Sequence, residues 1–538
     1  MQKKYLIYFG SNAIEEIESN PYILIDIAKG VDFKQIDNMA LNLGINYDNE
    51  KRVTSGIKYG LIRSTYNGHT CVLKTNLIEF VISLLDVSKE NVEDGFINLK
   101  MKNEIVVEER ENEEYVYLYA FYKAEEEIAL RIKRLQKAKN VKQVQHIEAE
   151  LKKVESNSKI ELSDKQKEAV KLVNENNVTI ITGGPGTGKT TIIKSIIDIY
   201  EGKGKKVVLC APTGRAAKRM TETTEKEAST LHRLLEIGKI SEDSLYKNTS
   251  DYEGAPIDGD LIIVDEMSMV DMFLMNYLLK CIYQGTKLIL VGDEDQLASV
   301  GPGSVLKDFI HSEQIATIHL DKIFRQAAKS KIVLNAHRVN QGEYFLKKGE
   351  EENSEEMKED FFFIKEIYQE KMLEEVISLC TGRLQNYGNY DFFQSIQVLT
   401  PTKKGMLGTK ELNKALQEKL NPNINNLPEK ASMGAIYRLG DRVMQIKNNY
   451  DIYWEKEVAG KKEMGSGVFN GEIGTITEIN EREKQVEIRF DDDKVAWYEF
   501  SDLDQIEHSY AITIHKSQRK WIWRSCHGNS TSISNVNH

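Results

Sequence analysis

Apolar and polar residues follow two different patterns along this chain. From about residue 159, short runs that are apolar on both faces alternate with helical segments, and these runs are "VTIITGG", "KVVLCAPT", "LIIVDEM", "KLILVGDEDQ" and "ATIHL". Such runs are typical of strands buried in a parallel sheet. Strands that alternate with helices predict an open, doubly wound α/β domain whose site lies at the carboxyl ends of the strands.

A second set of strand-like runs, "IQVLTPT" and "AITIHKS", lies farther along the chain. The region between them contains short strands with period-two alternation, including "DRVMQIKN", "GEIGTITEI", "KQVEIRF" and "KVAWYEF". Their spacing predicts a small antiparallel barrel that is inserted into a second α/β domain.

The front of the chain follows a mainly helical pattern instead. Residues 1–50 predict short helices with tight turns, and residues 51–123 predict helices followed by a hairpin in "EIVVEERENEEYVYLYAF". Residues 124–158 are highly charged and predict a helical connector. A solvated linker helix is the plainer interpretation, and contact between its basic middle and phosphates is the alternative.

Composition narrows the class of protein. The 538 residues suffice for three or four domains, and 41% hydrophobic with 29% charged residues is ordinary for a soluble globular protein. No apolar run reaches the roughly 20 residues of a membrane helix, and the first residues do not form a signal peptide. Five scattered cysteines without a C-x-x-C pair indicate a reducing cytoplasm rather than a zinc site or disulfide frame. The net charge of −11 means that nucleic acid would need local basic grooves.

The clearest chemical motif is "GGPGTGKTT", which follows a predicted strand and precedes a predicted helix. Its glycines let backbone N–H groups face a phosphate at the helix N-terminus, so the motif predicts an ATP site. Lys189 would reach the β and γ phosphates, and Thr190 would hold Mg²⁺. The predicted ATP-binding residues are Gln166, Gly183, Gly184, Pro185, Gly186, Thr187, Gly188, Lys189, Thr190 and Thr191.

Acidic and amide side chains follow two later strands. Asp265 would complete the Mg²⁺ shell, and Glu266 would polarise the attacking water. Gln296 in "VGDEDQLASVGPG" can hydrogen-bond a γ-phosphate or its water. A capped strand end and a plain polar turn are the structural alternatives. Ser163 and Gln166 form a capping box, which would by itself account for Gln166; adenine recognition by its amide is the functional interpretation.

In this order, the motifs resemble those of superfamily 1 helicases, specifically the RecD-like branch that moves 5′→3′ on single-stranded DNA. The stretches that carry the resemblance include "DKQ", "GGPGTGKTT", "APTGRAAKRM", "STLHRLL", "VDEMSM", "GDEDQLASVGPG", "DKIFRQA", "GDRVMQIKNNYD" and "AITIHKSQ". The resemblance implies that Arg325 reaches the γ-phosphate from the second α/β domain. It further implies a set of DNA-contacting positions: Thr213, Arg215, Thr230, His232, Thr402, Thr513 and His515.

The resemblance also implies the fold class. It is α/β, with two RecA-like parallel-sheet P-loop domains, an inserted SH3-like β-barrel and a mostly helical N-terminal region. In the N-terminal part, the predicted boundaries are 1–54 for an incomplete helix-hairpin-helix, 55–123 for a winged-helix-like unit and 124–158 for a helical linker. The first RecA-like domain is predicted over 159–322, with a duplex-splitting pin near 235–257. The second RecA-like domain is predicted over 323–429 and 506–518, with the SH3-like insert at 430–505 and an aberrant tail at 519–538.

Two stretches depart from the family pattern. The hairpin usually carries Gly-Ile-Gly, whereas this chain has Gly30-Val31-Asp32, and the acid should repel phosphate. After Gln518 the usual Gly-Ser, strand and final arginine motif do not follow, so we expect a reading-frame shift there. The second sheet would then keep an unpaired edge, and hydrolysis and unwinding would be weak.

The sequence therefore predicts an ATP-dependent DNA helicase of RecD-like type, impaired in this chain. It would use ATP and Mg²⁺, bind single-stranded and duplex DNA, and act as a cytoplasmic monomer in DNA repair or recombination. The alternative is an ATP-regulated DNA-binding protein without unwinding activity. A different P-loop enzyme, such as a kinase, is a third class, which the order of the motifs disfavours.

Overall fold

The computed structural model describes residues 13–27, 32–139, 143–237, 254–324, 329–346, 360–388, 390–424, 427–458, 460–517 and 525–527. The chain divides into two compact units. The first unit comprises residues 1–346 and 352–360, and the second comprises residues 347–351 and 361–538. Each unit contains hydrophobic cores of its own.

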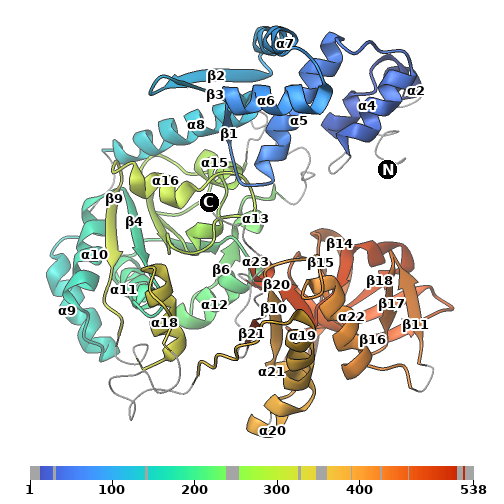
Figure 1. The fold of residues 1–538 in the computed structure, drawn as a ribbon. Helices are drawn as coiled ribbons and strands as arrows, with labels where there is room; N and C mark the ends of the chain where they lie inside the picture. Colours follow the sequence, from blue (N-terminus) through green and yellow to red (C-terminus); the bar gives the residue numbers. More distant parts are fainter. Residues whose placement is uncertain are drawn as a thin grey trace. The chain divides into compact units, whose positions relative to one another are not determined.

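The N-terminal part of the first unit is mainly helical (Figure 1, blue). A small antiparallel sheet of order β1-β3-β2 lies with its helices. The predicted hairpin is confirmed, because β2 pairs with β3 through a turn at Glu111 and Asn112, whose φ angles of 50° and 66° suit a two-residue hairpin turn. The elements are α2 (Ala13–Ser19), α3 (Ile23–Ile27), α4 (Phe33–Asn42), α5 (Glu50–Thr65), β1 (Cys71–Leu73), α6 (Lys74–Leu85), α7 (Lys89–Met101), β2 (Ile105–Arg110) and β3 (Glu113–Leu118).

Asp32, the acidic residue of the unusual hairpin, has a structural role. It is the N-cap of α4, and its Oδ1 accepts a hydrogen bond from the backbone N–H of Lys34 at 3.2 Å. Gly30 and Val31 lie outside the described residues. The carboxylate of Asp32 therefore stands at the helix N-terminus, the position that a phosphate would otherwise favour.

A parallel sheet of order β6-β5-β7-β8-β4-β9 forms the centre of the first unit. The strands that the apolar runs predict are all present, and the doubly wound α/β fold is confirmed. Side chains alternate between the two faces: Ile180 and Ile262 enter one core, whereas Ile181 and Ile263 enter the other. The strands are β4 (Val178–Gly183), β5 (Val207–Ala211), β6 (Ala228–Thr230), β7 (Leu261–Val264), β8 (Lys287–Gly292) and β9 (Ala316–Leu320).

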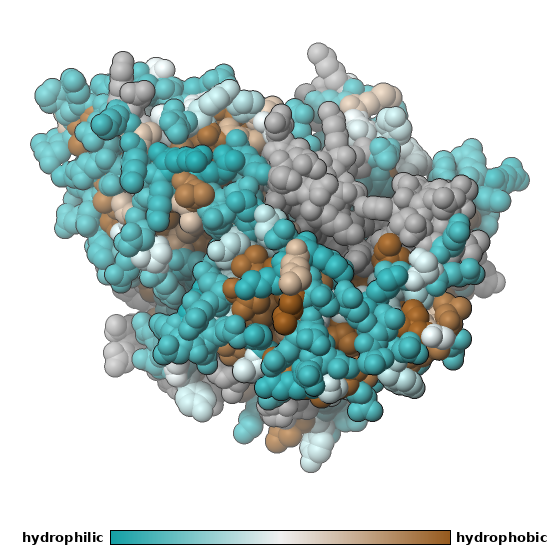
Figure 2. All heavy atoms as spheres, turned by 90° about the horizontal axis from the view of Figure 1, so that it is seen from above, coloured by the Kyte–Doolittle hydropathy of each residue, from teal (hydrophilic) through white to brown (hydrophobic). Residues whose placement is uncertain are grey.

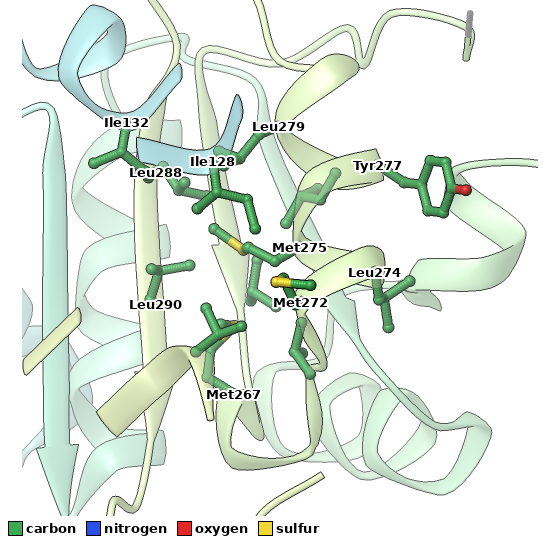
Figure 3. Close-up of a cluster of buried hydrophobic side chains, with 14 of the residues drawn as sticks. Ile128, Ile132, Met267, Met272, Leu274, Met275, Tyr277, Leu279, Leu288 and Leu290 are labelled. Atoms are coloured by element: carbon green, nitrogen blue, oxygen red, sulfur yellow. The ribbon is translucent and has the colours of Figure 1, made fainter. Parts of the chain in front are cut away.

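Helices cover both faces of this sheet. On one face lie α9 (Ile147–Ser158), α10 (Asp164–Glu175) and α11 (Lys189–Glu201), whose apolar residues share a core with the strands. On the other face lie α8 (Tyr119–Gln136) and α15 (Met272–Lys280). Figure 3 shows Ile128 and Ile132 of α8 beside Leu288 and Leu290 of β8. The helix α8 is therefore not a solvated connector, because one of its faces is apolar and packs against the sheet although its sequence is rich in charge.

Lys287 begins β8 and is buried against the end of α10. Its Nζ donates hydrogen bonds to the backbone carbonyls of Val173, Asn174 and Asn176 at 2.9, 2.9 and 2.7 Å. These are carbonyls that the helix itself leaves without partners at its C-terminus. Burial lowers the pKa of Lys287 from its ordinary 10.5 to about 8.

We expect this lysine to make stability rise with pH above about 8. Between pH 8 and 10.5 the folded chain releases the proton of Lys287 before the unfolded chain does, so the unfolded state binds more protons and stability increases with pH. The gain is at most about 3 kcal/mol from the size of the pKa change. Denaturant unfolding of the wild type and Lys287→Met across this range measures it, with Lys307→Met, an exposed lysine, as the control. Parallel pH profiles for the wild type and Lys287→Met would contradict the prediction.

The second unit contains a parallel sheet and an antiparallel sheet (Figure 1, orange to red). The parallel sheet has the order β20-β10-β21, and α22 (Thr409–Leu420) packs against β20. Its strands are β10 (Gln397–Thr400), β20 (Ala511–Thr513) and β21 (Ser525–His527). Because β21 pairs with β10 in the region after Gln518, β10 is the central strand, and β20 and β21 are the edge strands among the described residues.

The antiparallel sheet has the order β15-β14-β18-β17-β16-β13-β19 and confirms the inserted β structure. The hairpin of β14 and β15 adds to the strands that the sequence predicts. Apolar side chains of this sheet, including those of Val486 and Ile488, pack together in a hydrophobic core. Its strands are β13 (Arg442–Gln445), β14 (Asn449–Val458), β15 (Lys461–Val468), β16 (Ile473–Asn480), β17 (Gln485–Phe490), β18 (Val495–Glu499) and β19 (Ile506–His508), with β11 (Glu429–Ser432) and β12 (Ala435–Arg438) as a separate pair.

The surface is predominantly polar on the face that Figure 2 draws. Hydrophilic side chains predominate there, and hydrophobic side chains form small groups among them. Scattered apolar side chains of this kind are normal on folded proteins. No helix in the described part of the chain combines the length and the apolar character that crossing a membrane requires.

Candidate nucleotide site

The "GGPGTGKTT" motif forms the loop between β4 and α11, as predicted from its sequence context. Gly188 is the N-cap of α11 with a φ of 83°, a left-handed conformation that favours glycine. A Cβ on Gly188 would also collide with Nε2 of Gln166. Thr187 is buried and donates a hydrogen bond from its Oγ1 to the carbonyl of Gly184 at 2.9 Å. Gly188 and Thr187 thus fix the conformation of the loop that leads into the N-terminus of α11.

Lys189 is folded back onto the loop. Its Nζ donates hydrogen bonds to the carbonyl oxygens of Gly183 and Gly184, the latter at 3.0 Å. Burial lowers the pKa of Lys189, and the charges of Asp293, Asp265 and Glu266 act against that shift. The ammonium group therefore lies within electrostatic reach of three carboxylates, two of which follow β7 and one of which follows β8.

Asp265 and Glu266 follow β7 and share a buried environment. Burial raises the pKa of Asp265, which the hydrogen bond from the N–H of Glu266 at 2.9 Å and the charges of Lys189 and Arg219 oppose. Burial, with the neighbouring charge of Asp265 second, raises the pKa of Glu266. Glu266 has a φ of 55°, a conformation that is uncommon for a residue other than glycine. Two adjacent carboxylates with raised pKa values indicate a site that favours a cation.

Gln296 joins this group through Asp293. Its Nε2 donates a hydrogen bond to Oδ2 of Asp293 at 3.3 Å, and Asp293 is buried directly after β8. The sequence interpretation assigned a role to Gln296 and none to Asp293. The signal for Asp293 was available, because it follows a buried strand as Asp265 does.

Gln166 lies beside the loop with its amide already engaged. The predicted capping box is confirmed: Oε1 of Gln166 accepts from the N–H of Ser163 at 2.9 Å, and Oγ of Ser163 accepts from the N–H of Gln166 at 3.3 Å. Its Nε2 reaches the carbonyl of Gly188 at 3.5 Å. The capping role and proximity to the ATP loop are therefore both present, and adenine recognition stays a prediction.

Two further residues at the loop are absent from the sequence-based set. The backbone N–H of Phe324 donates to the carbonyl of Gly186 at 3.2 Å, and its ring lies over Gly188. His337, in α18 (Lys331–Asn340), places its ring against Gly184. Phe324 lies in the "DKIFRQA" motif, but neither residue has a predicted role at the loop, because each reaches it only through folding. Arg325, the predicted γ-phosphate arginine, lies outside the described residues.

The positions predicted to contact DNA fall at the carboxyl ends of strands in both units. Thr213 and Thr230 cap α12 (Gly214–Thr224) and α13 (Leu231–Leu234), and their Oγ1 atoms accept from the N–H groups of Ala216 and Arg233 at 3.3 and 3.1 Å. Thr230 lies opposite Ala211 in the pairing of β5 with β6, so both threonines stand at one edge of the sheet. Arg215 belongs to α12 and His232 to α13.

In the second unit, Thr513 ends β20 and pairs with Thr400. Thr513 is buried and accepts a hydrogen bond from the N–H of Lys516 at 3.3 Å, whereas His515 is exposed. Thr402 donates to the carbonyl of Lys404 at 3.0 Å just after β10. All these threonines have local structural bonds, so their contact with DNA stays a prediction.

A parallel sheet with a nucleotide loop at its carboxyl edge defines a P-loop NTPase of RecA-like architecture. Three family models match the chain: the AAA domain over residues 161–354, the ATP-dependent RecD-like DNA helicase SH3 domain over residues 412–490, and the ATP-dependent RecD2 DNA helicase HHH domain over residues 2–71. By these matches the chain is similar to the RecD2-like helicases in three separate regions.

Whole-chain relatives agree with this family. The chain is 29% identical to the ATP-dependent RecD2 DNA helicase of Deinococcus radiodurans over 521 residues, which is 95% of this chain and 66% of that protein. It is 30% identical to the RecBCD enzyme subunit RecD of Buchnera aphidicola subsp. Acyrthosiphon pisum over 413 residues, which is 66% of this chain and 65% of that protein. The chain thus spans slightly less than two thirds of the length of these relatives. The crystal structure of Pif1 helicase from Candida albicans matches with a TM-score of 0.36 at 19% identity, over 68% of this chain and 88% of that one, which is too distant to bear on the fold.

Proposed function

We propose that this chain is an ATP-driven DNA helicase of RecD2-like type that moves 5′→3′ along single-stranded DNA. The observation that carries the proposal is the convergence of Lys189, Asp265 and Glu266 beside the loop that follows β4. The order of the matched domains, which is that of RecD2 helicases, supports the choice of DNA as the partner. The direction of movement rests on the family resemblance.

Hydrolysis would begin with a change in the partners of Lys189. A bound triphosphate offers stronger acceptors than the carbonyls of Gly183 and Gly184, so the ammonium group would turn to the β and γ phosphates. The loop N–H groups and the N-terminus of α11 would hold the same phosphates. Gln166 and the ring of Phe324 both lie beside Gly188 of the loop, and we propose that they contact the nucleoside.

The residues present fit Mg²⁺ as the cofactor. Burial raises the pKa of both Asp265 and Glu266. The positive charges nearby therefore do not fully compensate these buried carboxylates, and a divalent cation would supply the missing charge. Among the described residues no three His, Cys, Asp or Glu side chains gather into a metal site. Thr190 and Asp265 would therefore share the ion with phosphate oxygens and water, as Mg²⁺ commonly requires. When bound, the ion neutralises charge on the phosphates.

Glu266 is proposed to take a proton from the attacking water. Its raised pKa makes the carboxylate a better base than an exposed glutamate. Gln296, held by Asp293, would orient the same water or the γ-phosphate. Arg325 is proposed on resemblance alone to stabilise the transferring phosphoryl group.

Single-stranded DNA is proposed to contact the threonines, arginine and histidines at the strand ends. We further propose that the protein acts as a monomer in the cytoplasm on single-stranded and duplex DNA, in repair or recombination. These statements rest on the family resemblance and the scattered cysteines.

ATP hydrolysis by the 538-residue chain, with and without single-stranded DNA, tests the proposal. Weak DNA-stimulated turnover that disappears in Lys189→Ala is the expected result, because we propose that hydrolysis is impaired in this chain. Thr223→Ala, which removes an exposed hydroxyl that bonds only within α12, is the matched control. Nucleotide binding without DNA-stimulated turnover would overturn the proposal and favour an ATP-regulated DNA-binding protein. Turnover of a small substrate without DNA would favour another P-loop enzyme.

A further inference from the structure

The helix α18 touches the nucleotide loop at its C-terminal turn. Nε2 of His337 lies 3.2 Å from the carbonyl oxygen of Pro185. The imidazole also fills the space above Gly184, where a Cβ would stand only 2.5 Å from Cε1 of His337. The absence of a side chain at Gly184 is what allows the ring to approach so closely.

The same helix is hydrogen-bonded to both residues at which the chain leaves the first unit. Asn335 is buried and bonds both backbone groups of Leu346: its Nδ2 donates to the carbonyl at 3.2 Å, and its Oδ1 accepts from the N–H at 2.7 Å. Leu346 is the last residue of the first unit before the chain passes to the second. At the start of the helix, the N–H of Ile332 donates to Oδ1 of Asp360 at 3.2 Å, and Asp360 is the last residue before the second passage.

Further bonds keep residues 341–346 fixed to the helix. Nε of Arg338 donates to the carbonyl of Tyr344 at 2.9 Å, and the N–H of Glu343 donates to the carbonyl of Arg338 at 2.8 Å. Arg338 also forms an ion pair with Glu343 at 2.9 Å. A displacement of α18 would therefore move Leu346 with it, because the connecting segment has little freedom of its own.

Nucleotide binding changes the loop at the point that His337 touches. Lys189 now satisfies the carbonyls of Gly183 and Gly184, next to Pro185. When its ammonium group turns to a phosphate, the carbonyl of Gly183 loses this donor and that of Gly184 keeps the hydroxyl of Thr187, so the hydrogen bonds of the loop change. The contact between Pro185 and His337 lies within this rearranged stretch.

We propose that α18 couples occupancy of the nucleotide loop to both chain passages into the second unit, with His337 and Asn335 as positioning residues. His337 contacts the loop and moves with it, and the hydrogen bonds of Asn335 transmit the displacement of α18 to Leu346. This inference rests on the proposed function, because it requires that the loop bind nucleotide.

Amide hydrogen exchange of the full chain, with and without saturating ADP and Mg²⁺, tests the coupling. In the wild type we expect ADP to change exchange across residues 331–346 by at least about threefold. His337→Ala should lose this change while ADP affinity stays within about threefold. His337→Gln, which retains a side-chain N–H donor, should restore part of it. Val339→Ala, an exposed position on the same helix, should behave as the wild type.

Asn335→Ala separates the two steps. It should keep the ADP-dependent change within α18 and in residues 341–344, which Arg338 holds to the helix, and lose it at residues 345–346. A purely structural role of Asn335 would not produce this division. Titration with ADP is measured first. Absence of binding overturns both the proposed function and the coupling. Binding with an unchanged helix, or with a change that persists in His337→Ala, overturns the coupling alone.

Discussion

Glu266→Gln is expected to reduce ATP turnover by about 10²–10⁴-fold, the range that positioned general bases contribute. The glutamine keeps the size and buried position of Glu266 and cannot accept a proton from water. ATP binding should remain or become tighter, because a negative charge is removed near the triphosphate. The physical basis is the environment of Glu266, where burial and Asp265 raise the pKa of the carboxylate.

This raised pKa also gives the reaction a dependence on pH. Below the pKa of Glu266 the group is protonated and cannot act as the base, so turnover should fall on the acid side at a higher pH than an exposed glutamate would cause. Steady-state hydrolysis and nucleotide titration of the same variant measure both effects. Asp295→Asn, an exposed acid in the neighbouring loop, is the matched control. Turnover of Glu266→Gln close to the wild-type value would remove Glu266 from the mechanism.

Asp441→Ala is expected to destabilise the second unit by about 3–5 kcal/mol, the usual result of removing one partner of a buried charged network. Asp441 is fully buried. Its Oδ2 accepts from Nε2 of Gln417 at 2.6 Å and the N–H of Arg438 at 2.7 Å, and its Oδ1 accepts from Nδ2 of Asn421 and the hydroxyl of Tyr510, both at 2.8 Å. Each of these donors would lose this acceptor, although the amides of Gln417 and Asn421 would keep the carbonyls of Ile436 and Leu439.

The network explains why the charge of Asp441 matters. Burial disfavours the carboxylate, yet the hydrogen bond and charge of His508, at 3.1 Å, together with the bonds from Asn421 and Arg438, hold the pKa of Asp441 below its ordinary value. A lowered folded-state pKa contributes stability above the unfolded pKa, near 3.9 in model peptides, and that contribution is lost as the pH falls through the folded pKa. Asp441→Asn should therefore cost stability near neutral pH and less in strong acid.

Thermal unfolding of the full chain measures this effect. For a unit of this size, about 3 kcal/mol corresponds to a fall of about 6–12 °C in the midpoint of its transition. Asp493→Ala, at a surface turn of the same β region, is the control. An unchanged transition in Asp441→Ala would show that the network adds nothing to the stability of this unit.

Several elements were predictable because their signals are local. The strands around the nucleotide loop are continuous apolar runs, and the hairpin of β2 and β3 has a polar two-residue turn. The capping box at Ser163 needs only residues within one turn of helix. Other elements were missed where local sequence misleads: α8 is rich in charge yet buries Ile128 and Ile132, and β14 with β15 lacks a clear alternation.

The sequence by itself indicated the resemblance to RecD-like helicases, the class of fold and the order of the ATP-site motifs, because each depends on residue type and spacing along short stretches. Only the tertiary structure decided that Asp293 and Arg219 stand near the acidic pair and that His337 rests on the nucleotide loop. It also decided that the carboxylate of Asp441 joins α22, β19 and Tyr510, the residue before β20. These contacts join residues far apart in the chain, and the packing of whole elements brings them together. The local sequence pattern does not show which distant residues come into contact. These contacts are seen only in the folded chain, as buried side chains and shared hydrogen bonds.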